Sequence, residues 1–121
     1  MQIVTDIINL EELKKELAGE RWNKLSIIEQ MTNIGCDVDR AICLRNEGKL
    51  DYSRNAFNRA IELLDFTIAD PKNKKRWNEL CPLKDHLIDY FVYDNKYATS
   101  DEWFQKYFSY FSHIHRSQKG K

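Results

Sequence analysis

Residues that break helices are scarce along this chain. Only two prolines and four glycines interrupt its 121 residues, and alternation of β-branched with polar residues is nearly absent. Apolar residues recur three and four positions apart, which is typical of amphipathic helices rather than strands. The sequence therefore predicts an all-α fold, an up-and-down bundle of four main helices with a short extra N-terminal helix. By length, residues 1–121 form a single helical-bundle domain, with an N-terminal segment at 1–21 and a frayed tail at 116–121.

Capping residues and glycines predict where these helices begin and end. Gly19 and Gly48 are expected to end the first two helices, because glycine readily adopts the left-handed conformation common at helix C-termini. Asp70 followed by Pro71 is a favourable helix start, and Ser100 can cap the last helix. The predicted helices cover residues 9–18, 24–47, 51–68 and 70–91, and a fifth begins after residue 100.

The second predicted helix carries a glycine at its centre, within the segment QMTNIGCDVDR at 30–40. On a helical wheel Gly35 lies in the middle of the apolar arc rather than among the charged residues. The third predicted helix has small residues on its own apolar face, including Ala56 and Ala60. Since small side chains let helix axes approach, we expect Gly35, Ala56 and Ala60 to mark close helix packing.

The charged residues of the same segment divide between two faces. Asp37 is expected to face solvent and to pair with Arg40 three positions on. Asp39 falls at the edge of the apolar arc, and a carboxylate buried there needs a partner. Arg54 or Arg59 on the next helix would supply a buried ion pair, and the sequence does not choose between them.

The overall charge excludes no class of binding partner, because 19 basic side chains balance 19 acidic ones. The halves differ: residues 1–70 hold 9 basic and 13 acidic side chains, and residues 71–121 hold 10 and 6. This split is consistent with a dipolar surface or self-association. No run of about 18 apolar residues occurs, so no membrane partner is expected. Three cysteines without C-x-x-C spacing fit a reduced cytoplasmic compartment.

Motifs for catalysis or cofactor binding are absent, and we expect neither a metal nor a cofactor. His113 and His115 stand two positions apart and diverge on a helix, so they cannot share a metal ion. The strongest basic cluster could contact a nucleic-acid backbone, with nearby tryptophans for base stacking. It comprises Lys72, Lys74, Lys75 and Arg76.

Four short elements lie between residues 22 and 111: W-x-K-L-S-I-I-E-Q, N-I-G-x-x-V-x-R-A, F-x-R-A-I-E-L-L-D-x-T-I and D-Y-F. Together they resemble a small prokaryotic helical family whose organisation is similar to HEPN-type bundles. This resemblance implies a helical bundle that accompanies a nucleotidyltransferase or acts as a toxin–antitoxin RNase. The RNases of that group carry an arginine followed after four to six residues by histidine. Here the nearest counterpart is Lys106 with His113, which serves only as a test pair.

Without a catalytic motif, the sequence favours a non-enzymatic, HEPN-like helical interaction protein that dimerises or binds a partner protein. The partner implied by the resemblance is a nucleotidyltransferase or a toxin–antitoxin component. The alternative is an RNA-binding protein or a degenerate HEPN-type endoribonuclease that uses the basic cluster for phosphates.

Overall fold

The computed structural model describes the backbone of residues 2–119 and the side chains of residues 11–118. The all-α prediction is confirmed, because no described residue lies in a strand. A 3-10 helix, η1, interrupts the series of five α-helices. The elements are α1 (Gln2–Asn23), α2 (Ile27–Asn46), α3 (Leu50–Ala69), η1 (Pro71–Arg76), α4 (Trp77–Val92) and α5 (Asp101–Lys119).

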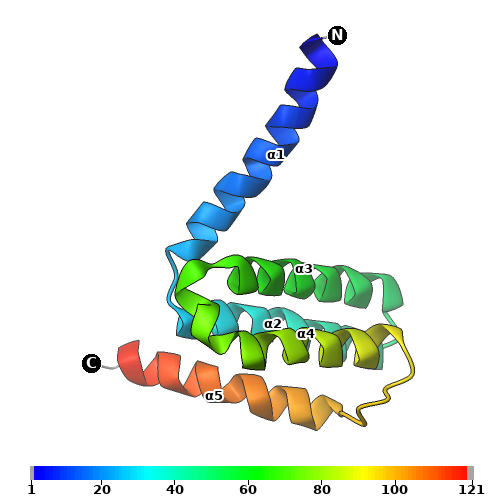
Figure 1. Cartoon of the computed structure of the whole chain (residues 1–121). Coiled ribbons are helices and arrows are strands. Elements are labelled where there is room, and N and C mark those ends of the chain that lie inside the picture. The colour runs from blue at the N-terminus through cyan, green and yellow to red at the C-terminus, as the bar shows by residue number, and fades with distance from the viewer. Residues whose placement is uncertain (1, 120–121) are drawn as a thin grey trace.

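Helices α2, α3, α4 and α5 lie side by side, and α1 extends away from them near the bend that η1 makes between α3 and α4 (Figure 1). We refer to α2–α5 as the bundle. Its core combines aliphatic side chains of α2, α3 and α4 with aromatic side chains of α5. The most deeply buried of these are Met31, Ile34, Ile42, Leu64, Leu80, Leu87 and Phe104.

Helix α1 is longer than the predicted helix at 9–18. Gly19 does not end it, and the helix continues to Asn23. The reason is a tertiary contact, since the Trp22 side chain is buried and its Nε1 donates a hydrogen bond to Thr67 Oγ1 at 2.8 Å. Gly19 lies against Phe66, where a Cβ would stand 3.5 Å from the ring. The gain from burying Trp22 outweighs the weak local tendency of glycine to end a helix.

Two other predicted boundaries are corrected. The segment predicted as one helix at 70–91 is divided into η1 and α4, and Asp70 caps η1 by accepting a hydrogen bond from the Lys72 amide at 3.1 Å. Helix α2 begins at Ile27 because Ser26 and Glu29 form a reciprocal capping box. At the C-terminal end, where a frayed tail was predicted for residues 116–121, α5 is helical through Lys119, and residues 120 and 121 lie outside the described part.

Small residues let α2 approach two neighbours. A Cβ added to Gly35 would stand 2.7 Å from Phe108 Cβ, so α5 packs directly on the glycine backbone. Ala56 and Ala60 of α3 are buried on the side of α3 that packs against the core. Ser53 lies so close to α2 that its hydroxyl donates a 2.6 Å hydrogen bond to the Ala41 carbonyl. Helix α2 therefore lies between α3 and α5.

Candidate functional site

Helix α1 presents the most unusual surface of the molecule. Every side chain from residue 11 to residue 18 is exposed, including two leucines. Leu13 keeps 49% and Leu17 keeps 41% of its surface accessible to solvent. These leucines differ from exposed apolar residues on loops because they repeat at helical spacing along one stripe of a helix that projects from the bundle (Figure 1).

A helix in this position receives little stabilisation from its own chain. Isolated helices of about 12–15 residues are marginal in water, and most helical stability in proteins comes from packing an apolar face. Among residues 11–23, the part of α1 whose side chains the structure describes, such packing lies near the C-terminal end, at Gly19 and Trp22. Leu13 and Leu17, upstream of these contacts, therefore leave apolar surface exposed on the projecting part of the helix.

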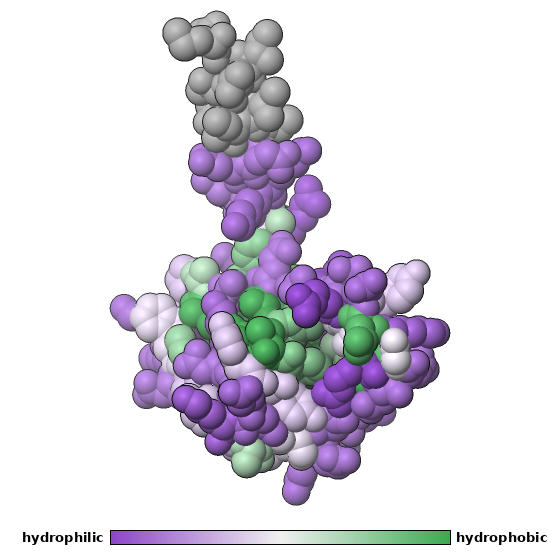
Figure 2. All heavy atoms as spheres, turned by 90° about the vertical axis from the view of Figure 1, so that its right-hand side faces the viewer, coloured by the Kyte–Doolittle hydropathy of each residue, from purple (hydrophilic) through white to green (hydrophobic). Residues whose placement is uncertain are grey.

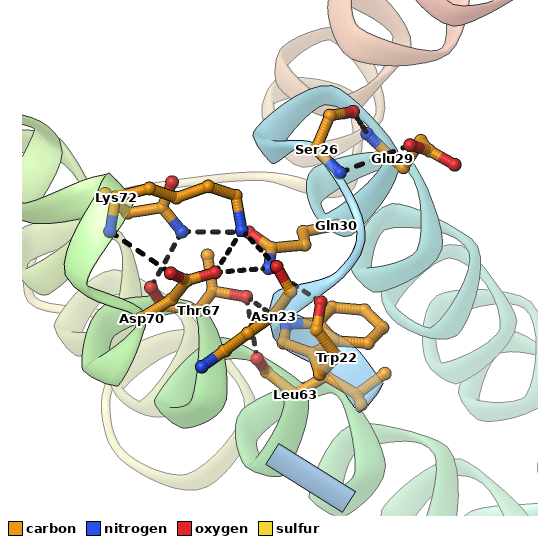
Figure 3. Close-up of polar contacts among 10 residues, drawn as sticks. Trp22, Asn23, Ser26, Glu29, Gln30, Leu63, Thr67, Asp70 and Lys72 are labelled. Carbon is orange, nitrogen blue, oxygen red and sulfur yellow. Dashed lines mark hydrogen bonds and ion pairs between the residues drawn. The ribbon is translucent and has the colours of Figure 1, made fainter. Parts of the chain in front are cut away.

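A buried polar network fixes the end of α1 to the bundle (Figure 3). Gln30 of α2 is fully buried, and its Nε2 donates to the Trp22 carbonyl at 3.0 Å and to Asp70 Oδ2 at 2.9 Å. Asn73 donates to Gln30 Oε1 at 2.8 Å. The Lys72 ammonium pairs with Asp70 and donates to the Asn23 carbonyl at 2.9 Å. The network thus joins α1, α2, α3 and η1.

The carboxylate of Asp70 is held in its charged form within this network. Burial alone would raise its pKa, but hydrogen bonds from Lys72 and Gln30 outweigh that effect and lower the pKa below its ordinary value. Because Lys72 and Gln30 also contact the end of α1, the charged carboxylate organises the anchor of the protruding helix.

A second polar cluster joins α2, α4 and α5 at the opposite end of the bundle. Arg45 Nη2 lies 2.6 Å and 2.7 Å from the two carboxylate oxygens of Asp101, and Tyr90 donates its hydroxyl proton to the same carboxylate at 2.5 Å. Burial would raise the pKa of Asp101, but hydrogen bonds from Tyr90, Arg45 and Asn46 lower it overall. This cluster ties the start of α5 to the rest of the bundle.

The Asp101 cluster makes the free energy of unfolding depend on pH. An unfolded aspartate has a pKa near about 3.9, and the native pKa is lower, so the unfolded state binds more protons as pH falls through this range. The contribution of Asp101 is therefore complete above the ordinary pKa and is lost as pH falls toward the native value. We expect Asp101→Asn to cost about 2 kcal/mol at pH 7 and to flatten the fall in stability between about pH 5 and pH 2.

Urea denaturation at a series of pH values measures this effect. Asp94→Asn is a suitable control, because Asp94 is exposed and has no hydrogen-bond or ion-pair partner in the described part of the chain. Parallel pH profiles of Asp101→Asn and the unmodified protein would contradict the prediction.

The predicted buried ion pair involves a different aspartate. Asp39 is exposed and accepts only a 3.3 Å hydrogen bond from Gln105, and Arg54 is also exposed, without a partner among the described residues. Asp37, predicted to face solvent, is buried and pairs with Arg59 at 3.2 Å and with Arg40 at 3.8 Å. The prediction for Asp39 is wrong because α3 covers the flank of α2 that carries Asp37.

The basic cluster is only partly available to a ligand. Lys72 is committed to Asp70 and Asn23, and Arg76 pairs with Glu79 at 3.5 Å. Lys74 lies 6.0 Å from the centre of the Trp77 ring. Of the four cluster residues, Lys75 is the one whose side chain has no hydrogen bond, ion pair or ring contact with the described part of the chain. The cluster therefore stabilises η1 and the start of α4 to a degree that the sequence pattern did not indicate.

The test pair of the sequence analysis forms no shared site. Lys106 and His113 are both exposed, and neither side chain has a hydrogen-bond or ion-pair partner in the described part of the chain. His86 instead packs on aromatic rings, 4.4 Å from Tyr97 and 5.9 Å from Trp103 between ring centres. Among residues 11–118, no three histidine, cysteine, aspartate or glutamate side chains are grouped so as to hold a metal ion.

Apolar surface also gathers at the end of the bundle where α2 ends and α3 begins. Figure 2 faces this end and shows hydrophobic atoms in its centre, surrounded by hydrophilic ones. A hollow of about 560 Å³ lies there between Arg45, Leu50, Phe57, Phe91 and Val92. In the described part of the chain, no helix combines the length and the apolar character that crossing a bilayer requires.

Comparison with protein-family models, with curated proteins and with solved structures gives no significant match. The assignment of function therefore depends on the surfaces described above.

Proposed function

We propose that this chain is a non-enzymatic helical interaction protein that binds a partner protein through α1. In this proposal α2–α5 form an up-and-down, HEPN-like four-helix bundle, which supports the projecting helix. The partner is a second copy of the chain or a different protein, and the resemblance to HEPN-type bundles makes nucleotidyltransferases and toxin–antitoxin components the first candidates. Cys36, Cys43 and Cys81 are exposed free thiols, which fits a cytoplasmic setting.

The observation that carries the proposal is the contrast between the two parts of α1. Its C-terminal end is anchored by the buried Trp22 and the surrounding polar network, whereas Leu13 and Leu17 are exposed on the projecting part. A purely structural helix would bury its leucines against its own bundle. Burying a leucine stabilises a complex by about 1.5–3 kcal/mol, so these two residues offer substantial binding energy to a partner.

The polar groups of the bundle give less support to a nucleic-acid function. Lys75, Lys74 and the half-exposed Trp77 would favour RNA binding, but Lys72 and Arg76 already have acidic partners. RNA binding therefore stays the second candidate, and Lys106 with His113 supplies no arrangement that would favour cleavage.

Photo-crosslinking in the cells that produce the protein tests the proposal. A photoreactive phenylalanine analogue at residue 13 or 17 is expected to form a discrete covalent adduct with a protein, because both side chains lie on the proposed contact surface. The same analogue at exposed Asn33 of α2 is the matched control and should form no such adduct. Absence of a discrete adduct from both residues 13 and 17 would overturn the proposal.

A further inference from the structure

The exposed leucines of α1 face away from the bundle that the helix belongs to. At about 100° per residue, Leu13 and Leu17 lie roughly 140–180° around the helix from Trp22. Trp22 is the residue that packs against α3 through Thr67. A second helix could therefore lie along the leucines without displacing the bundle of either molecule.

The spacing of the leucines matches one seam of a two-stranded coiled coil. Leu13 precedes Leu17 by four residues, and in the sequence Leu10 stands three residues before Leu13. This alternation of three and four residues defines the a and d positions that pack across a helix pair. Continued upstream, it places Asp6 at the preceding d position and Ile3 at the a position before that, so the unbroken apolar run covers Leu10, Leu13 and Leu17. With Leu17 at a and Leu13 at d, Lys15 and Trp22 occupy f positions on the opposite side, where the bundle lies.

Charges beside the seam distinguish between the two directions of pairing. Glu16 occupies a g position on one flank, while Lys14 and Arg21 occupy e positions on the other, and all three are exposed. In a parallel pair, a g residue faces the e residue five positions later on the other helix. This rule places Glu16 opposite Arg21 of a second copy. An antiparallel pair would instead bring Glu16 beside Glu16 and Lys14 beside Lys14.

The apolar seam is short and ends before the bundle begins. The next d position after Leu17 carries Glu20, which is exposed and charged. Two glutamates facing each other at this point would repel, so the seam ends there. Because only a few a and d residues pack across the two helices, we expect the dimer to dissociate on dilution.

We propose that α1 pairs in parallel with α1 of a second copy of this chain, through Leu13 and Leu17 and the charge pair of Glu16 with Arg21. The inference rests on the proposed function, because it names the partner of that same surface.

Sedimentation equilibrium of the purified full-length chain tests the pairing. The unmodified protein is expected to show a monomer–dimer equilibrium, and the double variant Leu13→Glu, Leu17→Glu is expected to be monomeric with unchanged thermal unfolding of the bundle. Lys15→Glu, an f position on the same helix, is the control and should dimerise normally. Glu20→Leu should tighten the dimer by extending the seam.

A charge exchange then tests the direction. Glu16→Arg and Arg21→Glu should each weaken the dimer about tenfold, because each creates two like-charge contacts. The double exchange should restore dimerisation, which an antiparallel pair cannot do through these positions. Failure of that restoration, or a dimer insensitive to the leucine variants, would overturn the inference.

A chain that stays monomeric at every concentration would also overturn it. The photo-crosslink at residues 13 and 17 then separates the two proposals. An adduct with a different protein would leave the proposed function standing, and absence of any adduct would remove both.

Discussion

Replacing Gly35 by leucine is expected to lower the free energy of unfolding by about 3 kcal/mol, at the upper end of the usual cost of overpacking. The cause is contact with α5, because even a Cβ at residue 35 would stand 2.7 Å from Phe108 Cβ and 3.0 Å from its Cγ. The helix axes must separate, and this separation disturbs the packing of Ile42 and Phe104 beside the contact.

Thermal and urea unfolding measure this cost. Cys36→Leu is the matched control, since Cys36 is the next residue of the same helix and is exposed. It adds a similar side chain without meeting α5 in the same way and should change stability by less than about 0.5 kcal/mol. Equal stability of the Gly35→Leu and Cys36→Leu variants would show that α5 does not press on Gly35.

Replacing Gln30 by leucine is expected to cost a similar amount, about 3 kcal/mol, although the side chains are close in size. Gln30 is fully buried and donates to the Trp22 carbonyl and to the Asp70 carboxylate. Leucine would remove both of these hydrogen bonds and the one that Gln30 accepts from Asn73. A buried hydrogen bond contributes about 0.5–1.5 kcal/mol, and one to a charged group contributes about 1.5–3 kcal/mol. The effect should be larger near α1 than in the rest of the bundle, because both acceptors belong to its anchor.

Hydrogen exchange together with urea unfolding separates the global and local parts of this effect. In the Gln30→Leu variant we expect faster exchange of amides at residues 19–23 than at residues 34–42 of α2, relative to the unmodified protein. Asn33→Leu, an exposed change on the same helix, should leave both regions as they were. Exchange that accelerates equally in the two regions would argue against a separate anchor for α1.

Local patterns were sufficient to predict most of the helices. The apolar arc of α2 placed Met31, Ile34, Gly35, Val38 and Ile42 inward, and all of them are buried. Ser100 accepts a hydrogen bond from the Trp103 amide at 3.1 Å, as expected of a cap. These features depend on residues close together in the sequence, which is why they could be read from it.

The features that were missed depend on contacts between distant residues. The Trp22–Thr67 hydrogen bond spans 45 positions and extends α1 beyond Gly19. Asp37 and Asp39 lie on opposite flanks of one apolar arc, and only the packing of α3 and α5 decides which flank is covered. The exposed leucines of α1 did have a sequence signal, because Leu13 and Leu17 follow helical spacing. The helix predicted at 9–18 is short, and a short helix gave no reason to expect that its leucines would project from the bundle.

The attachment of α1 near its C-terminal end has a mechanical consequence. A helix of 22 residues rises about 33 Å along its axis, and its side-chain contacts with the bundle, among the described residues, are made near Gly19 and Trp22. The helix can therefore rotate as a rigid rod about the polar network. A rotation of about 5° there moves the N-terminal end of the helix by about 3 Å, as follows from that length. Small adjustments around Asp70 and Gln30 thus become large changes in where the free end of the helix can reach.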